Sequence, residues 1–487
     1  MLIHRAVNNA IRRFRENRLF KTRRLGSMLK CFVFCSLVCF GGAIAYGDNE
    51  WANWRGPNYD GSLEEASPPL SWSANQNIKW KVRVPGKGSG SPIVWGDRIY
   101  LTTAAQTERL GSPDMQGVPP GPDAGGPPGA FSRMNNEAPK NYFQFMVLAY
   151  DRATGNELWR KVVKEAVPHE SGHATNSYAS GSPVTDGKHI YASFGSFGVH
   201  CLTVDGELVW STDLGKMTTR NAFGEASTPA LHGETLVVPW DQDGYEDKNG
   251  NGQRDEDEHL SSIVALDTKS GSVNWRTPRP TEPTTWATPL IIESGGRTQV
   301  VTNGTTVRSY DLYSGQLLWE CGGQVTNPIP SPIRVGDSVV CMTGYRGNAV
   351  FSLALDGSGK LDGTDKVNWS RSDAAPYVAS ATLYKGQLYL TKSRDGIVTS
   401  VNAATGQVVF PETRMSGIRD MYASPVAAGD RIYFTGRDGT TTVLKHGQQY
   451  EELAVNQLGE PVDASPALCD NEIYIRGVEH MYCIAQE

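Results

Sequence analysis

The chain lacks the features that would place it in several common protein classes. Its apolar runs are too short for a membrane-spanning helix, which needs about 20 residues. Its apolar segments also lack the 3.6-residue period of amphipathic helices. Charged residues make up 20% and hydrophobic residues 39% of the 487 residues, which excludes a disordered chain and a coiled coil. Glycine is abundant instead, at 52 residues, so we expect a turn-rich chain with almost no helix.

Cysteine is scarce, with eight residues in the whole chain. Three of them lie in the apolar run of residues 31–40, close to the N-terminus. The other five are scattered and never adjacent or in C-x-x-C spacing: Cys201, Cys321, Cys341, Cys469 and Cys483. An odd number spread in this way is not a disulfide framework. We interpret these five residues as small buried apolar side chains.

The charge is distributed unevenly between the N-terminus and the rest. Residues 1–45 hold nine Lys and Arg and one acidic residue, so the remainder has a net charge of −14, which argues against a nucleic-acid partner. Lys30 precedes the apolar run, and Ala43 and Ala45 form an A-x-A cleavage site. We predict that residues 1–47 are a signal peptide, with a misassigned extension before Met28 as an open possibility. Cleavage near Ala45 or Gly47 predicts a periplasmic or secreted mature chain without a membrane span.

A repeated unit fills the rest of the sequence. A Ser/Thr-Pro or Ser-Ala pair opens an alternating apolar segment eight times, at Ser91, Ser182, Thr228, Thr288, Ser331, Ser380, Ser424 and Ser465. Four of the spacings, of 41 to 46 residues, match a propeller blade of about 40–45 residues. Each pair precedes a tight hairpin, a third strand, a turn with glycine and usually an aromatic residue such as Trp159 or Trp210. We expect these aromatic rings to lie between neighbouring sheets.

We therefore predict an all-β fold, an eight-bladed β-propeller of four-stranded antiparallel blades that spans residues 48–487. The eighth unit stops after its third strand, and the missing strand is expected at residues 77–84, around Trp80. Such an N-terminal strand would close the ring, because an unpaired strand edge is a liability. A set of separate β-sandwiches is the alternative that we considered.

Two insertions interrupt the repeat. Residues 105–142 are rich in Pro and Gly and poor in apolar residues, which predicts a disordered loop. The second insertion, residues 243–259, contains a twelve-residue segment with the spacing of a calcium loop and Gly252 at its sharp turn. Its candidate Ca²⁺ ligands are Asp247, Asn249, Asn251, Gln253 (through its carbonyl), Asp255 and Glu258. Arg254 departs from the usual pattern, and an acidic solvated loop is the alternative.

Polar and aromatic residues fall in the connections between predicted strands. In a propeller, connections of one kind from every blade converge at one end of the channel, so these residues are ligand-binding candidates. They are His173, Asn176, Arg220, Glu225, Trp286, Arg346, Arg437, Asp438, Arg476 and His480, together with Tyr377, Asp420 and Tyr422. The alternative for each is a structural contact between blades. The sequence contains no P-loop or dinucleotide motif and no evident Ser/His/Asp arrangement.

These units resemble the pyrroloquinoline quinone (PQQ)-like β-propeller repeats, whose A-x-D-x-x-T-G-x-x-x-W motif is seen around residues 148–159, 264–275 and 309–319. The segments WANWRGPNYDGS (51–62) and SYASGSPV (177–184) resemble exported propellers of the planctomycete type. The resemblance covers about residues 50–487. The superfamily includes quinoprotein alcohol dehydrogenases and the outer-membrane assembly factor BamB, and it implies an eight-bladed fold.

The resemblance leaves two functions open. We predict an exported, non-catalytic module that binds a protein or a small ligand at the channel face and carries a peripheral calcium loop. The alternative is a PQQ-dependent oxidoreductase of the alcohol dehydrogenase type. Such enzymes carry a vicinal Cys-Cys ring against the quinone, which this chain lacks, and the calcium-like loop lies in an insertion that should project from the rim. We therefore do not expect PQQ as a cofactor.

Overall fold

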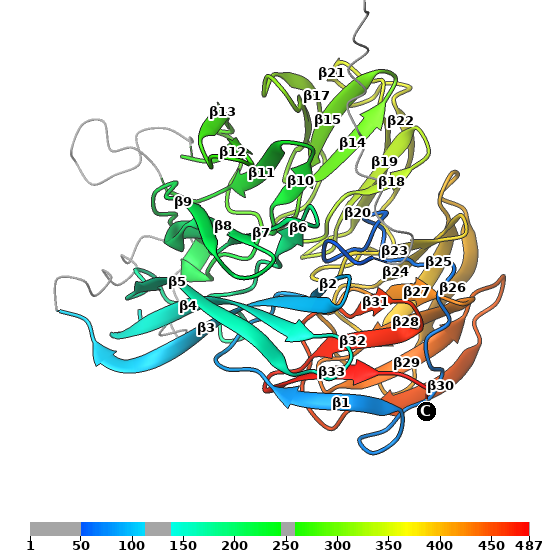
Figure 1. The fold of residues 1–487 in the computed structure, drawn as a ribbon. Coiled ribbons are helices and arrows are strands. Elements are labelled where there is room, and N and C mark those ends of the chain that lie inside the picture. The colour runs from blue at the N-terminus through cyan, green and yellow to red at the C-terminus, as the bar shows by residue number, and fades with distance from the viewer. Residues whose placement is uncertain (1–49, 113–137, 245–258, 487) are drawn as a thin grey trace, which may run out of the picture. The chain divides into compact units, whose positions relative to one another are not determined.

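The computed structural model describes residues 50–112, 138–244 and 259–486. In these segments the chain forms eight antiparallel sheets that surround a central axis, as Figure 1 shows, so the predicted all-β eight-bladed propeller is confirmed. The only helices there are two 3₁₀ turns, Gly195–Phe197 (η2) and Arg220–Ala222 (η3). Across the same residues, no helix is long and apolar enough to cross a bilayer.

Blades 1 to 4 are formed in chain order, each from its innermost to its outermost strand. Blade 1 contains β2 (Ile93–Trp95), β3 (Arg98–Leu110), β4 (Asn141–Asp151) and β5 (Glu157–Ala166). Blade 2 contains β6 (Val184–Thr185), β7 (His189–Ser193), β8 (Val199–Thr203) and β9 (Leu208–Thr212). Blade 3 contains β10 (Ala230–His232), β11 (Thr235–Trp240), β12 (Ser262–Asp267) and β13 (Val273–Pro278). Blade 4 contains β14 (Leu290–Ser294), β15 (Arg297–Thr302), β16 (Val307–Asp311) and β17 (Leu317–Cys321), with β21 (Gly359–Lys360) added in parallel at its outer edge.

Blades 5 to 7 follow the same order. Blade 8 is formed by three strands from the C-terminal end of the propeller segment and one strand from its N-terminal end. Blade 5 contains β18 (Ile333–Val335), β19 (Ser338–Thr343), β20 (Ala349–Ala354) and β22 (Val367–Arg371). Blade 6 contains β23 (Thr382–Tyr384), β24 (Gln387–Thr391), β25 (Ile397–Asn402) and β26 (Val408–Arg414). Blade 7 contains β27 (Val426–Ala428), β28 (Arg431–Thr435), β29 (Thr440–Lys445) and β30 (Glu452–Gln457). Blade 8 contains β31 (Ala467–Cys469), β32 (Glu472–Arg476), β33 (His480–Ile484) and β1 (Ile78–Arg83).

The repeated Gly and Trp of the sequence form the contact between adjacent blades. The Trp159 indole of blade 1 lies on Gly206 of blade 2, where a Cβ would come within 2.6 Å of the ring. Gly206 also has a φ of 87°, a conformation that favours glycine. The turn therefore requires glycine for two reasons, its backbone conformation and the lack of space for a side chain. The indole Nε1 of Trp159 also donates to Val204 O, at 3.0 Å. The same pairing recurs between Trp210 and Gly271, Trp275 and Gly315, and Trp369 and Gly406.

The last blade takes its outermost strand from the N-terminal side of the chain. β1 pairs antiparallel with β33, with Trp80 opposite Cys483 and Arg83 opposite His480. The Trp80 ring lies on Gly155 of blade 1, and its Nε1 donates to Arg152 O at 2.9 Å. Blade 8 therefore contacts blade 1 through the same Trp-on-Gly arrangement as the four blade contacts named above, and Figure 1 shows β1 along the outer edge of β33.

The eight Ser and Thr residues that open the repeats form a ring around the axis. The backbone N–H of each donates to the hydroxyl of the next one, for example Ser424 to Ser465 at 2.9 Å and Ser465 to Ser91 at 3.0 Å. Seven of the eight steps are bonded in this way, at 2.8–3.2 Å. The hydroxyls thus satisfy backbone groups at the start of each innermost strand, where no ladder partner is available.

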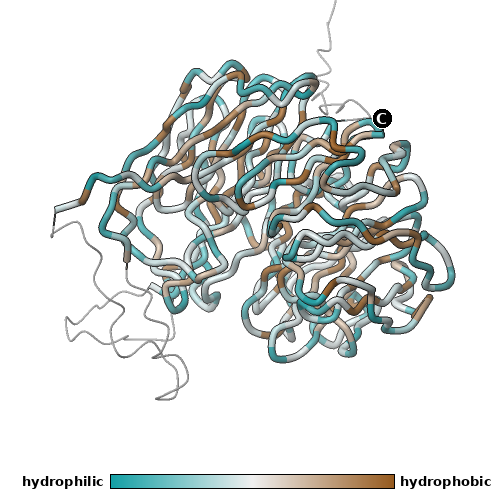
Figure 2. The backbone as a smooth tube through the Cα atoms, turned by 90° about the horizontal axis from the view of Figure 1, so that it is seen from below, coloured by the Kyte–Doolittle hydropathy of each residue, from teal (hydrophilic) through white to brown (hydrophobic). Residues whose placement is uncertain are grey.

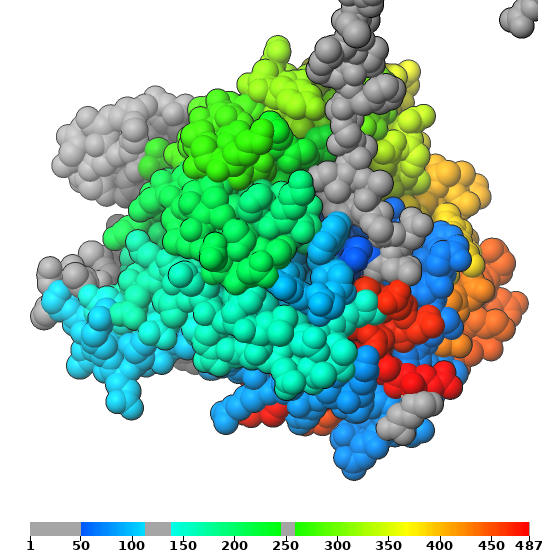
Figure 3. All heavy atoms as spheres, viewed as in Figure 1, coloured from blue at the N-terminus to red at the C-terminus, as the bar shows by residue number. Residues whose placement is uncertain are grey.

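Residues 50–66 lie across one end of the channel, and we call this segment the plug. It bonds to innermost strands around the ring, including Trp51 to Val94 of blade 1, Ala52 to Thr185 of blade 2 and Leu63 to Ala427 of blade 7. In Figures 1 and 3 it is the dark blue segment near the centre of the sheets. The tube in Figure 2 shows the apolar positions of the strands within the sheets, and Trp51 of the plug is fully buried against them. The plug therefore closes this end of the channel.

Arg55 fixes the plug to two blades. Its guanidinium is fully buried and donates to Pro425 O at 3.0 Å, to Ala381 O at 2.6 Å and to Asp60 O at 2.9 Å. Burial lowers the pKa of Arg55 to about 10. One planar group with several donors thus satisfies carbonyls from blade 6, blade 7 and the plug itself.

We expect the substitution Arg55→Lys to lower the free energy of unfolding by about 1–3 kcal/mol, because an ammonium cannot reach all of these carbonyls. Urea denaturation followed by tryptophan fluorescence measures this loss. The exposed Arg83 provides the matched control Arg83→Lys, for which we expect no change. Equal midpoints for the two variants would contradict the role assigned to Arg55.

The predicted insertions differ in part from the structure. β3 continues to Leu110 and β4 begins at Asn141, so the two ends of the segment 105–142 are strand rather than loop. The strand of residues 98–110 extends past the expected end of the blade, since Gln106 still pairs with Phe143 in the long hairpin. Residues 113–137 of this insertion, and residues 245–258 of the second, lie outside the described residues.

Candidate functional site

The channel contains a cavity of about 540 Å³, which we call the central cup. Its wall includes six aromatic residues: Trp54, Phe223, Trp286, Tyr345, Tyr377 and Tyr422. Seven hydroxyls of the Ser/Thr ring line it as well: Ser91, Ser182, Thr228, Thr288, Ser331, Ser424 and Ser465. Other polar lining residues are Ser89, His173, Thr175, Asn176, Ser180, Asn327, Ser393, Arg394 and Asp463. The volume lies in the range of about 300–1,000 Å³ typical of small-molecule sites.

Blade topology explains why these residues meet. Most of them either precede an innermost strand, as Trp286 and Tyr422 do, or connect the second and third strands of a blade, as Tyr345 and Arg394 do. In an antiparallel blade both kinds of connection lie at the same end of the channel. The plug contacts the innermost strands at their other ends and contributes Trp54 to the cup. The cup is therefore closed on the plug side.

The aromatic wall is held in place by its own contacts. Tyr345 and Tyr377 stack with their ring centroids 4.6 Å apart and their planes inclined by 25°. The Trp286 indole donates to Gly224 O at 2.7 Å. The Arg437 guanidinium lies 4.1 Å from the ring centroid of Tyr422. These contacts orient the flat faces before any ligand binds, which lowers the entropy cost of binding.

His173 has a defined tautomer. Its Nδ1 accepts the backbone N–H of Thr175 at 3.2 Å and lies 2.8 Å from the Thr175 hydroxyl. Burial lowers the pKa of His173, and the charges of Arg394 and Arg437 lower it further. The neutral imidazole therefore carries its proton on Nε2, which is a hydrogen-bond donor.

The charged groups of the cup are largely paired with one another. Arg437 binds both oxygens of Asp463, at 2.6 and 3.1 Å. Arg394 donates to the Tyr422 hydroxyl at 3.2 Å and lies 3.6 Å from Asp420. Its side chain is 49% exposed, so Arg394 stands at the lip of the cup with donors to spare.

Four non-glycine residues with left-handed backbone line the cup or neighbour a residue that lines it. Asn327 and Ser393, which line it, have φ values of 56° and 55°. Ala222 precedes Phe223 at a φ of 52°, and Arg346 follows Tyr345 at a φ of 54°. A non-glycine residue in this left-handed region costs of order 1–3 kcal/mol, and such strain clusters at ligand sites.

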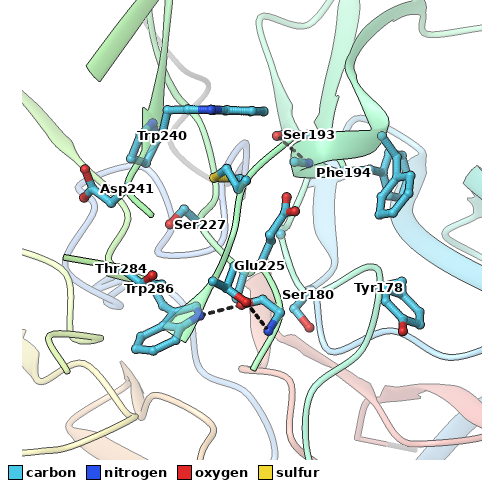
Figure 4. A pocket seen from close by; sticks show the side chains of 18 of the residues that line it. Tyr178, Ser180, Ser193, Phe194, Glu225, Ser227, Trp240, Asp241, Thr284 and Trp286 are labelled. Carbon is cyan, nitrogen blue, oxygen red and sulfur yellow. Dashed lines mark hydrogen bonds between the residues drawn. The ribbon is translucent and has the colours of Figure 1, made fainter. Parts of the chain in front are cut away.

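A second, smaller cavity of about 40 Å³ adjoins the cup and shares Ser180, Ala226 and Trp286 with it. Figure 4 shows the Glu225 side chain projecting into it, near Ser180 and Ser193. The Glu225 carboxyl group accepts the backbone N–H of Ser196 at 2.6 Å and bonds to the Ser196 hydroxyl at 2.5 Å. Burial raises the pKa of Glu225 to about 8, and no cation pairs with it among the described residues. Burial therefore favours the protonated form of Glu225.

The structure brings together six of the ten predicted ligand-binding residues. His173, Asn176 and Trp286 line the cup, and Glu225 lies in the adjoining cavity. Arg220 and Arg437 act indirectly, since each holds a lining residue: Arg220 donates to Asn327 at 2.9 Å, and Arg437 pairs with Asp463.

The other four predicted residues lie apart from the cup lining. Arg346 and Asp438 are exposed in turns, and the Asp438 carboxylate accepts the N–H of Thr440 at 3.0 Å. Arg476 is buried between blades 8 and 1 and bonds to Thr102 O at 2.5 Å. His480 pairs with Glu460 at 2.7 Å. Arg476 thus makes the structural contact between blades that was the alternative for each residue.

The sequence analysis missed Trp54, Tyr345 and Arg394 as lining residues. Trp54 belongs to the plug, whose path across the channel has no counterpart in the repeat. Tyr345 and Arg394 occupy the same connection in blades 5 and 6, so aligning the repeats by that connection could have found them. The Ser/Thr ring was recognised as the start of each repeat but not as a wall of the cup.

The residues present do not fit a calcium–quinone cofactor. The five described cysteines are free and buried, and none of them lines the cup. In the part of the chain that the structure describes, no group of three or more His, Cys, Asp or Glu is placed so that it could hold a metal ion. The one carboxylate of the cup wall, Asp463, is already bound by Arg437. The calcium-loop residues Asp247, Asn249, Asn251, Gln253, Asp255 and Glu258 lie outside the described residues.

Comparisons with known proteins agree with this architecture. BamB from Moraxella catarrhalis matches with a TM-score of 0.53 and 13% identity, over 84% of this chain and 97% of that one. The quinohemoprotein alcohol dehydrogenase of Comamonas testosteroni matches with a TM-score of 0.55 and 11% identity, over 90% of this chain and 81% of that one. At these identities the likeness shows the fold alone. A comparison with curated proteins found no match.

A family model described as outer membrane protein assembly factor BamB matches residues 144–412. These residues include the four strands of each of blades 2 to 5 and most of blade 6. The match spans more than half of the chain, and its repeats form the PQQ-like propeller seen in the structure. The chain therefore belongs to the BamB family of PQQ-like β-propellers.

Proposed function

We propose that the protein is an exported, non-catalytic binding propeller whose central cup holds a small ligand. The observation that carries this proposal is the cup itself, a closed-bottomed cavity of about 540 Å³ with a fixed aromatic wall and a ring of hydroxyls. The strained backbone at Asn327, Ser393, Ala222 and Arg346, in or beside the cup wall, supports a ligand role, because such strain is usually retained at functional sites. Because the family is that of an assembly factor, we also propose that the protein acts as a scaffold and binds a protein partner at the channel face.

Thermal shift against a library of water-soluble metabolites tests this proposal. We expect a ligand that raises the melting temperature of the wild type and has no effect on a Tyr345→Ala/Tyr377→Ala variant. Tyr313→Ala is the matched control, since Tyr313 is 67% exposed and lies outside the cup. A shift that survives in the double variant would place the ligand elsewhere and contradict the proposal.

The proposal includes export and a peripheral calcium site. Export rests on the basic, apolar segment before Ala45. The calcium site rests on the spacing of oxygen ligands from Asp247 to Glu258.

For the calcium loop, titration calorimetry of the wild type should give one site with a Kd of about 10⁻⁴–10⁻³ M, as for extracellular modules. The double variant Asp247→Ala/Glu258→Ala removes two charged ligands, and we expect its isotherm to be flat. The matched control changes two exposed acids elsewhere, Asp365→Ala/Glu479→Ala, and should bind as the wild type does. Flat isotherms for all three proteins would remove the calcium claim.

A PQQ-dependent oxidoreductase is the second candidate, favoured by the structural likeness to the quinohemoprotein dehydrogenases. Because the cup lacks cysteines and a free carboxylate, we expect reconstitution with PQQ and Ca²⁺ to give no dye-linked alcohol oxidation. Oxidation that depends on added PQQ would contradict the binding proposal and establish this one.

A further inference from the structure

The central cup presents hydrogen-bond donors that the described residues leave unused. A ring hydroxyl that accepts a backbone N–H keeps its own proton, and Ser182, Ser424 and Ser465 donate it to no described group although they are at least 96% buried. The Nε2–H of His173 likewise has no partner among the described residues. Buried donors without partners are unfavourable, so these groups call for a ligand rich in acceptor oxygens.

The aromatic wall adds a second requirement. The stacked pair Tyr345 and Tyr377 and the anchored indole of Trp286 offer fixed flat faces beside these donors. The negative face of an aromatic ring attracts polarised C–H groups, such as those on one face of a sugar ring. A molecule with an apolar flat face and oxygens around its edge satisfies both the rings and the donors, and this combination describes a saccharide.

The charged side chains at the open end of the cup indicate which class of saccharide it binds. Arg394 lies 3.6 Å from Asp420 but is 49% exposed and keeps further donors, whereas the carboxylate of Asp463 is held on both oxygens by Arg437. The positive potential of the two arginines reaches the imidazole, since both lower the pKa of His173. Such a potential disfavours a cationic ligand and favours a carboxylate at the lip.

We propose that the central cup binds an acidic saccharide, a mono- or disaccharide that carries a uronate carboxylate. Its ring lies on the aromatic wall, its hydroxyls bond to the Ser/Thr ring, and its carboxylate bonds to Arg394 and the Nε2–H of His173. This inference rests on the proposed function, because it names the ligand class of the same cup. Charge-assisted hydrogen bonds from a guanidinium are among the strongest polar contacts available for such a ligand.

Titration calorimetry with D-glucuronate, D-galacturonate and their disaccharides, each beside its neutral counterpart, tests the inference. We expect at least one uronate to bind about tenfold more tightly than the matching neutral sugar. Arg394→Gln should remove this preference, because the charge-assisted contact to the carboxylate is lost. Tyr377→Ala should weaken both sugars, and Tyr313→Ala should weaken neither. Near-UV circular dichroism of each variant reports whether the propeller is intact.

The outcomes separate this inference from the proposed function. Neutral sugars that bind as tightly as uronates, or a preference that survives Arg394→Gln, would overturn the acidic class. If no saccharide binds while a metabolite from the library occupies the cup, the inference fails and the proposed function stands. If nothing in either set binds to the cup of the folded protein, both fail together.

Discussion

A chain without residues 72–84 should aggregate rather than form a monomeric propeller. The deletion removes β1, so the backbone groups of β33 lose the partners that Trp80 to Arg83 provide. It also removes Trp72, which is buried and bonded through its backbone to Asn456. An open sheet edge pairs readily with a second chain, and blade 8 would present such an edge. Size-exclusion chromatography with light scattering should show oligomers and aggregate.

The point variant Trp80→Ala tests the same contact without removing the strand. Trp80 is 8% exposed and lies on Gly155 of blade 1, so truncation leaves a void between blades 8 and 1. We expect a loss of about 3–5 kcal/mol in the free energy of unfolding by urea. Arg83→Ala, an exposed position on the same strand, is the control and should cost little. A monomeric, equally stable deletion variant would show that the ring does not depend on β1.

The repeats predicted the fold because one physical arrangement recurs in every one of them. At five of the blade contacts a Trp packs on the glycine turn of the next blade, so the A-x-D-x-x-T-G-x-x-x-W spacing predicts a contact between blades as well as a hairpin. The extended hairpin of β3 and β4 was not predicted, since the Pro and Gly residues that follow obscured where the alternation ends. The short β21 was missed because two residues leave no periodic signal.

The site was predicted less completely than the fold, and the reason is physical. Topology shows that polar connections meet at one end of the channel, and it therefore located His173, Asn176 and Trp286. Whether an arginine faces a ligand or a neighbouring blade depends on a few ångströms of side-chain placement. Arg476 turns inward onto backbone carbonyls of blade 1, whereas Arg394 stands at the lip, and nothing in their local sequence distinguishes them.

Glu225→Gln should make the protein more stable than the wild type above pH 8. The native pKa of Glu225 is raised to about 8 by burial, whereas in the unfolded chain it returns to its ordinary value near 4.5. Between these values the native state holds a proton that the unfolded state has released. The stability of the wild type therefore falls as pH rises from about 4.5 to about 8 and changes little beyond, by about 1.4 kcal/mol for each pKa unit.

Glutamine removes this titration and keeps the local contacts. Its carbonyl oxygen can accept the Ser196 N–H as Glu225 Oε2 does, and its amide can donate to the Ser196 hydroxyl once that hydroxyl, which donates to Oε1 in the wild type, rotates. We expect the difference in unfolding free energy between variant and wild type to grow by several kcal/mol from pH 5 to pH 9. Urea denaturation across this range measures it, with Glu64→Gln at an exposed site as the control.

The same comparison distinguishes a neutral Glu225 from an ionised one. The Glu225 carboxyl group lies directly against Gly195, where a Cβ would come within 1.3 Å of its Oε2. An ionised carboxylate held in that space would have to lose its water without a counter-charge, which is unfavourable. If the difference between Glu225→Gln and wild type is flat with pH, the carboxyl group is solvated or paired in the native state. The small cavity beside the cup would then be open to water or to a cation.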